Sequence, residues 1–72
     1  MARFIIKPMY VSDLAQKYYP DRDYDSALRL FRKELHATSG LWEALQKEGF
    51  KEYTKVLTRS QVRTIIKFLG EP

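Results

Sequence analysis

The sequence predicts one mainly α-helical domain of four helices, with a helix-turn-helix arrangement and room for a short two-stranded β-ribbon. Three observations support this fold class. The chain has 72 residues, which is enough for a single hydrophobic core spanning residues 1–72. Apolar residues recur at helical spacing in four segments. Capping residues, glycine or proline mark the ends of those segments.

The first predicted helix covers residues 12–19. Ser12 is a suitable N-cap, and Asp13 suits the positive end of the helix dipole. Pro20 follows the segment and disfavours helical backbone in the residue before it. A short helix with one apolar face is therefore expected here.

The second predicted helix runs from about residue 25 to residue 36. Acidic residues precede it and open it, where capping and the dipole favour carboxylates: Asp21, Asp23 and Asp25. Its apolar stripe consists of Tyr24, Ala27, Leu28, Phe31 and Leu35. The opposite arc carries Ser26, Arg29, Lys33 and His36, with Arg32 at its edge. Leu30 falls outside the stripe and is expected to touch a second helix or a partner.

The third predicted helix covers residues 39–48. Either Thr38 or Ser39 can cap it, and Gly49 follows at the position where a left-handed residue commonly ends a helix. Short strands are predicted at 3–7 and 53–57, since both are rich in β-branched or aromatic residues. Whether the two strands pair is left open by the sequence.

The fourth helix, 59–69, has the strongest pattern. Thr58 and Gln61 match a capping box, in which two side chains satisfy backbone N–H groups reciprocally. A basic strip recurs at every fourth residue: Arg59, Arg63 and Lys67. The predicted core comprises Phe4, Ile6, Leu14, Ala15, Tyr18, Leu28, Phe31, Leu35, Leu41, Leu45, Ile65, Ile66 and Leu69.

Composition argues against several functions. The chain has no cysteine and a single histidine, His36, so disulfides and thiolate or imidazole metal sites are not expected. It has neither a nucleophile–base motif nor a glycine-rich phosphate loop. We therefore expect that the protein is not an enzyme and that it binds neither a cofactor nor a small-molecule substrate. No apolar run is long enough for a membrane span or a secretion signal, which favours a cytoplasmic protein.

The positive charge suggests a partner. Thirteen basic and nine acidic residues give a net charge of +4. In a helix-turn-helix the second helix enters the major groove, so Ser26, Arg29, Arg32 and Lys33 are candidate contacts to double-stranded DNA. In this interpretation Arg29 and Lys33 face the groove, while Arg59, Arg63 and Lys67 hold the phosphate backbone.

Two other interpretations stay open at this point. The basic faces can be ordinary solvated surfaces. Alternatively, the domain is a protein-interaction module, a homodimer or an adaptor, that uses exposed Leu30, Tyr19, Tyr24 or Trp42.

Four motifs also resemble a known family. They are Ser12-Asp13-Leu14-Ala15-x-x-Tyr18-x-Pro20, Ala27-Leu28-x-x-Phe31, Leu41-x-x-Ala44-Leu45, and Leu57-Thr58-x-x-Gln61-Val62-x-x-Ile65-x-x-x-Leu69-Gly70-Glu71-Pro72. Together they resemble a family of short Bacteroidetes proteins, domain of unknown function 4248. The family pattern often carries Arg-Arg-Trp where this chain has Leu30-Phe31-Arg32. The Leu-Ala-x-x-Tyr opening is also similar to helix-turn-helix segments in small mobile-element proteins, which implies a regulatory or accessory role by analogy only.

Overall fold

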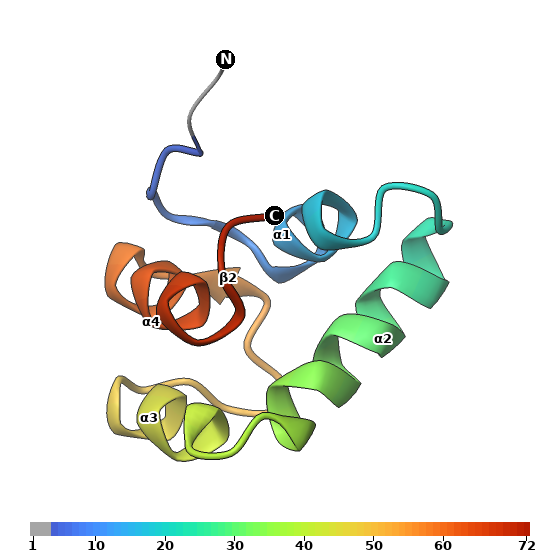
Figure 1. The fold of residues 1–72 in the computed structure, drawn as a ribbon. Helices are drawn as coiled ribbons and strands as arrows, with labels where there is room; N and C mark the ends of the chain where they lie inside the picture. The colour runs from blue at the N-terminus through green and yellow to red at the C-terminus, as the bar shows by residue number, and fades with distance from the viewer. Residues whose placement is uncertain (1–3) are drawn as a thin grey trace.

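The computed structural model describes residues 4–72 and is mainly helical (Figure 1). Its elements, in chain order, are β1 (Met9–Tyr10), α1 (Val11–Tyr18), α2 (Tyr24–Ala37), α3 (Leu41–Lys47), β2 (Val56–Leu57) and α4 (Arg59–Leu69). The described residues thus form the four helices that the sequence predicts. They also form a small antiparallel ribbon, for which the sequence left room without settling the pairing.

The ribbon is shorter than predicted, and its first strand lies at Met9–Tyr10 rather than at 3–7. Met9 pairs with Leu57, and Tyr10 pairs with Val56. The prediction of a strand at 3–7 is wrong for residues 4–7, which form no strand, and residue 3 lies outside the described residues. Pro8 explains the shift, because it lacks an N–H for the ladder and separates this segment from the paired residues. In the 53–57 segment, only the last two residues are paired.

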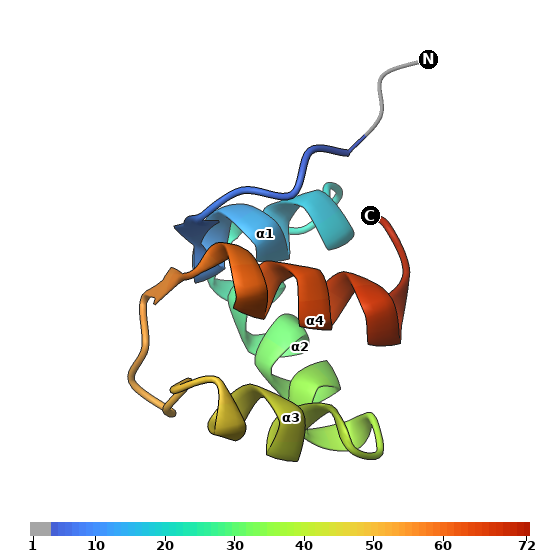
Figure 2. The same ribbon diagram turned by 90° about the vertical axis from the view of Figure 1, so that its left-hand side faces the viewer.

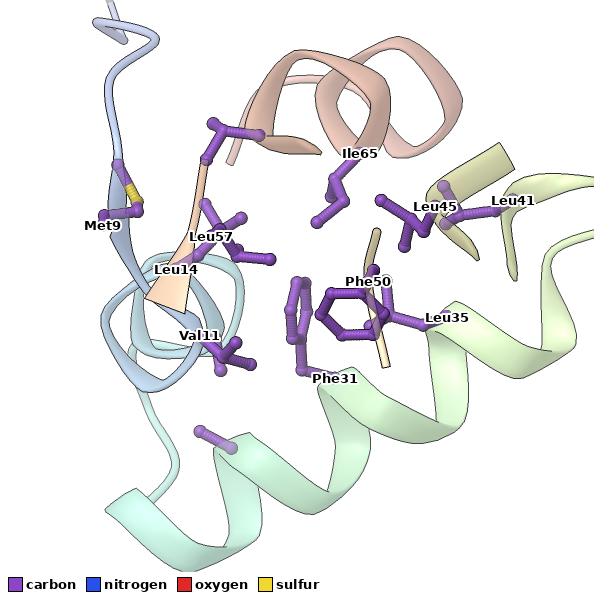
Figure 3. Packing of buried hydrophobic residues seen from close by; sticks show 13 residues of the cluster. Met9, Val11, Leu14, Phe31, Leu35, Leu41, Leu45, Phe50, Leu57 and Ile65 are labelled. Carbon is purple, nitrogen blue, oxygen red and sulfur yellow. The ribbon is translucent and has the colours of Figure 1, made fainter. Parts of the chain in front are cut away.

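The core lies between α2 on one side and α4 on the other (Figure 3). Phe31 of α2 points toward Leu14 of α1, Leu57 of β2 and Ile65 of α4. The buried hydrophobic residues are Met9, Val11, Leu14, Ala15, Ala27, Phe31, Leu35, Leu41, Leu45, Phe50, Leu57, Val62 and Ile65. Six residues of the predicted core are only partly buried against this cluster: Phe4, Ile6, Tyr18, Leu28, Ile66 and Leu69.

Two predicted N-caps are wrong. Helix α1 begins at Val11, with Tyr10 in the N-cap position and no side-chain cap. Helix α3 begins at Leu41, because Gly40 before it has a left-handed backbone, with φ of 82°. The Thr38 hydroxyl does not cap α3; it donates instead to the Glu34 carbonyl oxygen of α2 at 2.9 Å.

The starts of α2 and α4 follow the sequence pattern closely. Asp23 caps α2, accepting a hydrogen bond from the Ser26 backbone N–H at 2.8 Å. Helix α2 starts at Tyr24, just before the predicted start, and the Tyr24 side chain is 57% exposed rather than part of the apolar stripe. The capping box of Thr58 and Gln61 at the start of α4 is confirmed.

The elements pack so that the longest helix forms one margin of the molecule. Helix α1 packs against α2, and α3 follows α2 after a short turn and packs against α4 (Figures 1 and 2). Helix α4 lies across the core from α2 (Figure 3). As a result, the side of α2 that faces away from the core is left uncovered by the other elements.

Candidate nucleic-acid interface

Helix α2 carries a solvent-facing surface, which we call the α2 outer face and define as Ser26, Arg29 and Lys33. Phe31 and Leu35 of the same helix point into the core (Figure 3). At about 100° per residue, Arg29 and Lys33 lie nearly opposite Phe31. Arg29 and Lys33 are exposed and Ser26 is half-buried. The sequence prediction of a basic outer arc on this helix therefore matches the placement of these three residues.

Arg32 does not belong to this surface. Its guanidinium donates a hydrogen bond to the Glu52 backbone oxygen at 2.7 Å, and the residue is half-buried. Glu52 lies in the loop that precedes β2. Arg32 thus links α2 to that loop, a contact that the sequence could not reveal because its partner is distant along the chain.

The start of α2 partly offsets the positive charge of the outer face. Asp23 accepts hydrogen bonds from Ser26, and these bonds, with smaller effects from the charges of Arg29 and Arg22, hold the pKa of Asp23 below its ordinary value. A carboxylate therefore stays ionised beside Arg29. The field at the N-terminal part of the outer face is weaker than the count of basic residues suggests.

A second basic surface lies on α4. We call it the α4 strip, and it consists of Arg59, Arg63 and Lys67, all of them exposed. Glu48, just beyond α3, accepts hydrogen bonds from the hydroxyls of Ser60 and Thr64. Those bonds, and to a lesser extent the charge of Arg63, lower the pKa of Glu48.

The α2 outer face and the α4 strip do not come together. Val62 and Ile65 of α4 are buried, so the α4 strip points away from the core just as the α2 outer face does. The two helices lie on opposite sides of that core (Figure 3). The domain measures 30 × 26 × 21 Å. The two basic surfaces therefore face different sides of the domain.

A groove that the sequence did not indicate lies beside the outer face. Its volume is about 300 Å³, and its lining includes Tyr10, Tyr24, Leu28, Arg32 and Lys55. The Val11 backbone N–H donates to the Lys55 carbonyl oxygen at 2.8 Å, which holds the β2 approach against the start of α1. The β1–β2 pairing and the adjacent Val11–Lys55 bond bring Tyr10 and Lys55 to the same groove. Periodicity within one segment cannot show such a long-range relation.

Other kinds of site are not seen in the part of the chain that the structure describes. Residues 4–72 contain no group of three or more His, Cys, Asp or Glu side chains that could hold a metal ion. No helix within this range is long and apolar enough to cross a membrane.

These observations define a small, mainly α-helical domain with basic helix surfaces on opposite sides. The chain belongs to the family described as a domain of unknown function (DUF4248), whose model matches residues 5–72. The comparisons with curated proteins and with solved structures gave no match. Family membership brings no activity with it, so function rests on the surfaces of the molecule.

Proposed function

We propose that this domain binds double-stranded DNA through the α2 outer face. The observation that carries the proposal is the uncovered side of the longest helix, where Arg29 and Lys33 are exposed. Within the described residues 4–72, no hydrogen bond engages either side chain. Both side chains are therefore available to a polyanion.

The dimensions of α2 suit a major groove. A helix is about 10–12 Å across with its side chains, and the major groove of B-DNA is about 12 Å wide. Arg29 and Lys33 are separated by about 6 Å along the helix axis, which spans roughly two base pairs. An arginine can bind the acceptor edge of guanine, while a lysine or serine contacts phosphates or base edges.

Helix α2 serves this purpose better than α3. Residues 19–23 join α1 to α2, and the shorter turn 38–40 joins α2 to α3. The second connection has the three- to four-residue length typical of a helix-turn-helix, and the first is longer. The exposed side of α3, however, includes Glu43, which repels phosphate. We therefore assign groove contact to α2, with α1 as its supporting helix.

Two double variants test this assignment. We expect Arg29→Ala with Lys33→Ala to weaken binding to a random-sequence duplex by about tenfold or more at low salt, and to reduce the salt slope by about 2, since two phosphate-proximal charges are lost. The matched pair Arg63→Ala with Lys67→Ala removes the same charge from the opposite side. It should change affinity for a single duplex by about threefold at most.

Fluorescence anisotropy at several salt concentrations measures both effects. Equal loss in the two double variants would refute the assignment to α2. A parent protein that does not bind duplex at low salt would refute DNA binding as such.

The alternative is a protein-interaction module, and one observation favours it. Large apolar side chains are exposed at Ile5, Tyr53 and Val56, the last of these on β2. Of the residues first considered for such a role, Tyr24 is well exposed, whereas Trp42 is half-buried and stacks on His36 at a centroid distance of 3.8 Å. Self-association that persists at high salt in sedimentation experiments would support this alternative, because apolar contacts are screened little.

A further inference from the structure

The groove beside α2 combines an apolar floor with an aromatic rim. Val11 is buried and Leu28 half-buried in its lining. Tyr10 and Tyr24 also line the groove, with exposed fractions of 58% and 57%. Two tyrosines of this kind can cover an inserted side chain while their hydroxyls stay in water.

Two cations lie in the same lining. Arg32 is fastened by its hydrogen bond to the Glu52 carbonyl oxygen at 2.7 Å. Lys55 is held at its backbone by the bond from Val11 at 2.8 Å. A guanidinium has five N–H donors, so one bond to a carbonyl leaves donors for a ligand. Among the described residues that line the groove, none is acidic.

This combination favours an acidic peptide over other anions. A phosphate would satisfy Arg32 and Lys55 but leave Leu28 and the exposed rings of Tyr10 and Tyr24 in contact with water, at a hydrophobic cost. A peptide can fill that floor with an apolar side chain and present carboxylates to the cations in the same segment. The volume of about 300 Å³ is at the lower limit for a small-molecule site and suits one or two side chains.

We propose that this groove binds an acidic linear segment of a partner protein, which inserts an apolar side chain between Tyr10 and Tyr24 and pairs its carboxylates with Arg32 and Lys55. The proposal is independent of DNA binding. It places a protein partner beside the α2 outer face rather than on it.

The probe is a short fluorescein-labelled peptide with a central Leu-Phe pair flanked by glutamates. We expect Lys55→Glu to weaken its binding by about tenfold, because an attractive charge becomes a repulsive one. Tyr24→Ser should weaken it by about fivefold, because the aromatic cover is lost. Each variant has a matched control at a residue outside the groove. Lys51→Glu is the control for Lys55→Glu. Tyr53→Ser is the control for Tyr24→Ser, because the Tyr53 side chain is 87% exposed.

The controls should bind the peptide within about twofold of the parent protein. Two further probes examine its chemistry: a peptide with serines in place of Leu-Phe, and oligothymidylate. We expect both to bind more weakly than the original peptide. Far-ultraviolet circular dichroism of each variant verifies that the domain is folded.

Three results would overturn the proposal. One is an equal loss of binding in the groove variants and their matched controls. Another is full binding of the serine peptide, which would reduce the interaction to nonspecific charge. The third is oligothymidylate binding that is tighter than peptide binding and is lost in Lys55→Glu, which would assign the groove to single-stranded nucleic acid. None of these assays contains duplex, so failure here is separate from failure of the proposed DNA binding.

Discussion

Gln61 is a buried polar residue that connects two helices. It is 3% exposed. Its side-chain oxygen accepts from the Thr58 N–H at 3.0 Å, and its amide nitrogen donates to the Glu48 carbonyl oxygen at 2.9 Å. The sequence indicates the first of these contacts through the capping box. The second joins the start of α4 to the end of α3, and it explains why a glutamine side chain is fully enclosed.

Replacing Gln61 should therefore destabilise the domain more than replacing an ordinary capping residue. We expect Gln61→Ala to lower the free energy of unfolding by about 1–3 kcal/mol, because the Thr58 N–H and the Glu48 carbonyl oxygen lose their partner. Urea denaturation followed by circular dichroism measures this. Gln46→Ala, on the exposed side of α3, is the control and should change stability by less than about 0.5 kcal/mol. Equal midpoints for the two variants would contradict the bridging role.

At the scale of the elements, α3 is a short helix that depends on glycine at both ends. Gly40 precedes it with φ of 82°, and Gly49 follows it with φ of 88°. The Gly49 N–H donates to the Gln46 carbonyl oxygen at 3.0 Å, which closes the last turn. A Cβ atom at Gly49 would meet no other atom within 4 Å, so only the backbone conformation restricts that position.

A substitution at Gly49 therefore measures the free-energy cost of the left-handed backbone alone. We expect Gly49→Ala to destabilise the domain by about 1–2 kcal/mol, since an L-residue with a Cβ disfavours that conformation. The midpoint of thermal unfolding should fall by about 4–8 °C per kcal/mol in a domain of this size. Gly49→Asn should cost less, because asparagine tolerates the left-handed region better. If the alanine and asparagine variants melt together, backbone strain is not the cause.

The elements also show which features a sequence can predict. Helix α4 was predicted with its observed bounds because its capping box and apolar spacing are both local signals. The ribbon was misplaced at its N-terminal side because pairing depends on a distant strand and on the interruption at Pro8. Before α3, the hydroxyl of Thr38 donates to the Glu34 carbonyl oxygen of α2, so a cap that is plausible in sequence is not formed.

The same distinction applies to the candidate site. Periodicity correctly placed Arg29 and Lys33 opposite the apolar stripe, because one helix fixes its own faces. It could not show that the α4 strip lies across the core, or that Arg32 is fastened to Glu52. Those relations arise from tertiary packing, which no single segment encodes.

At the scale of the whole molecule, Tyr18 connects three helical segments. Its ring, at the end of α1, stacks on Phe31 of α2 at a centroid distance of 5.6 Å. Its hydroxyl donates to the carbonyl oxygen of Gly70, directly after α4, at 2.5 Å. Burial, with smaller effects from the charges of Glu71 and Tyr19, raises the pKa of Tyr18 to about 12. The neutral hydroxyl is therefore the form that the folded domain favours.

This raised pKa makes stability depend on alkaline pH. The pKa of Tyr18 in the folded state lies above the ordinary value of 10.0, so its contribution is fully present below pH 10 and is lost as the pH rises toward 12. We expect Tyr18→Phe to reduce the free energy of unfolding by about 1 kcal/mol at neutral pH, through loss of the bond to Gly70. Above pH 10, its stability should fall less steeply than that of the parent.

Denaturant unfolding at a series of pH values measures both effects. Tyr53→Phe changes an exposed tyrosine and should follow the parent at every pH. Parallel curves for the parent and Tyr18→Phe would mean that the hydroxyl does not link α1 to the end of α4. In that case Tyr18 would contribute to stability only through the packing of its ring on Phe31.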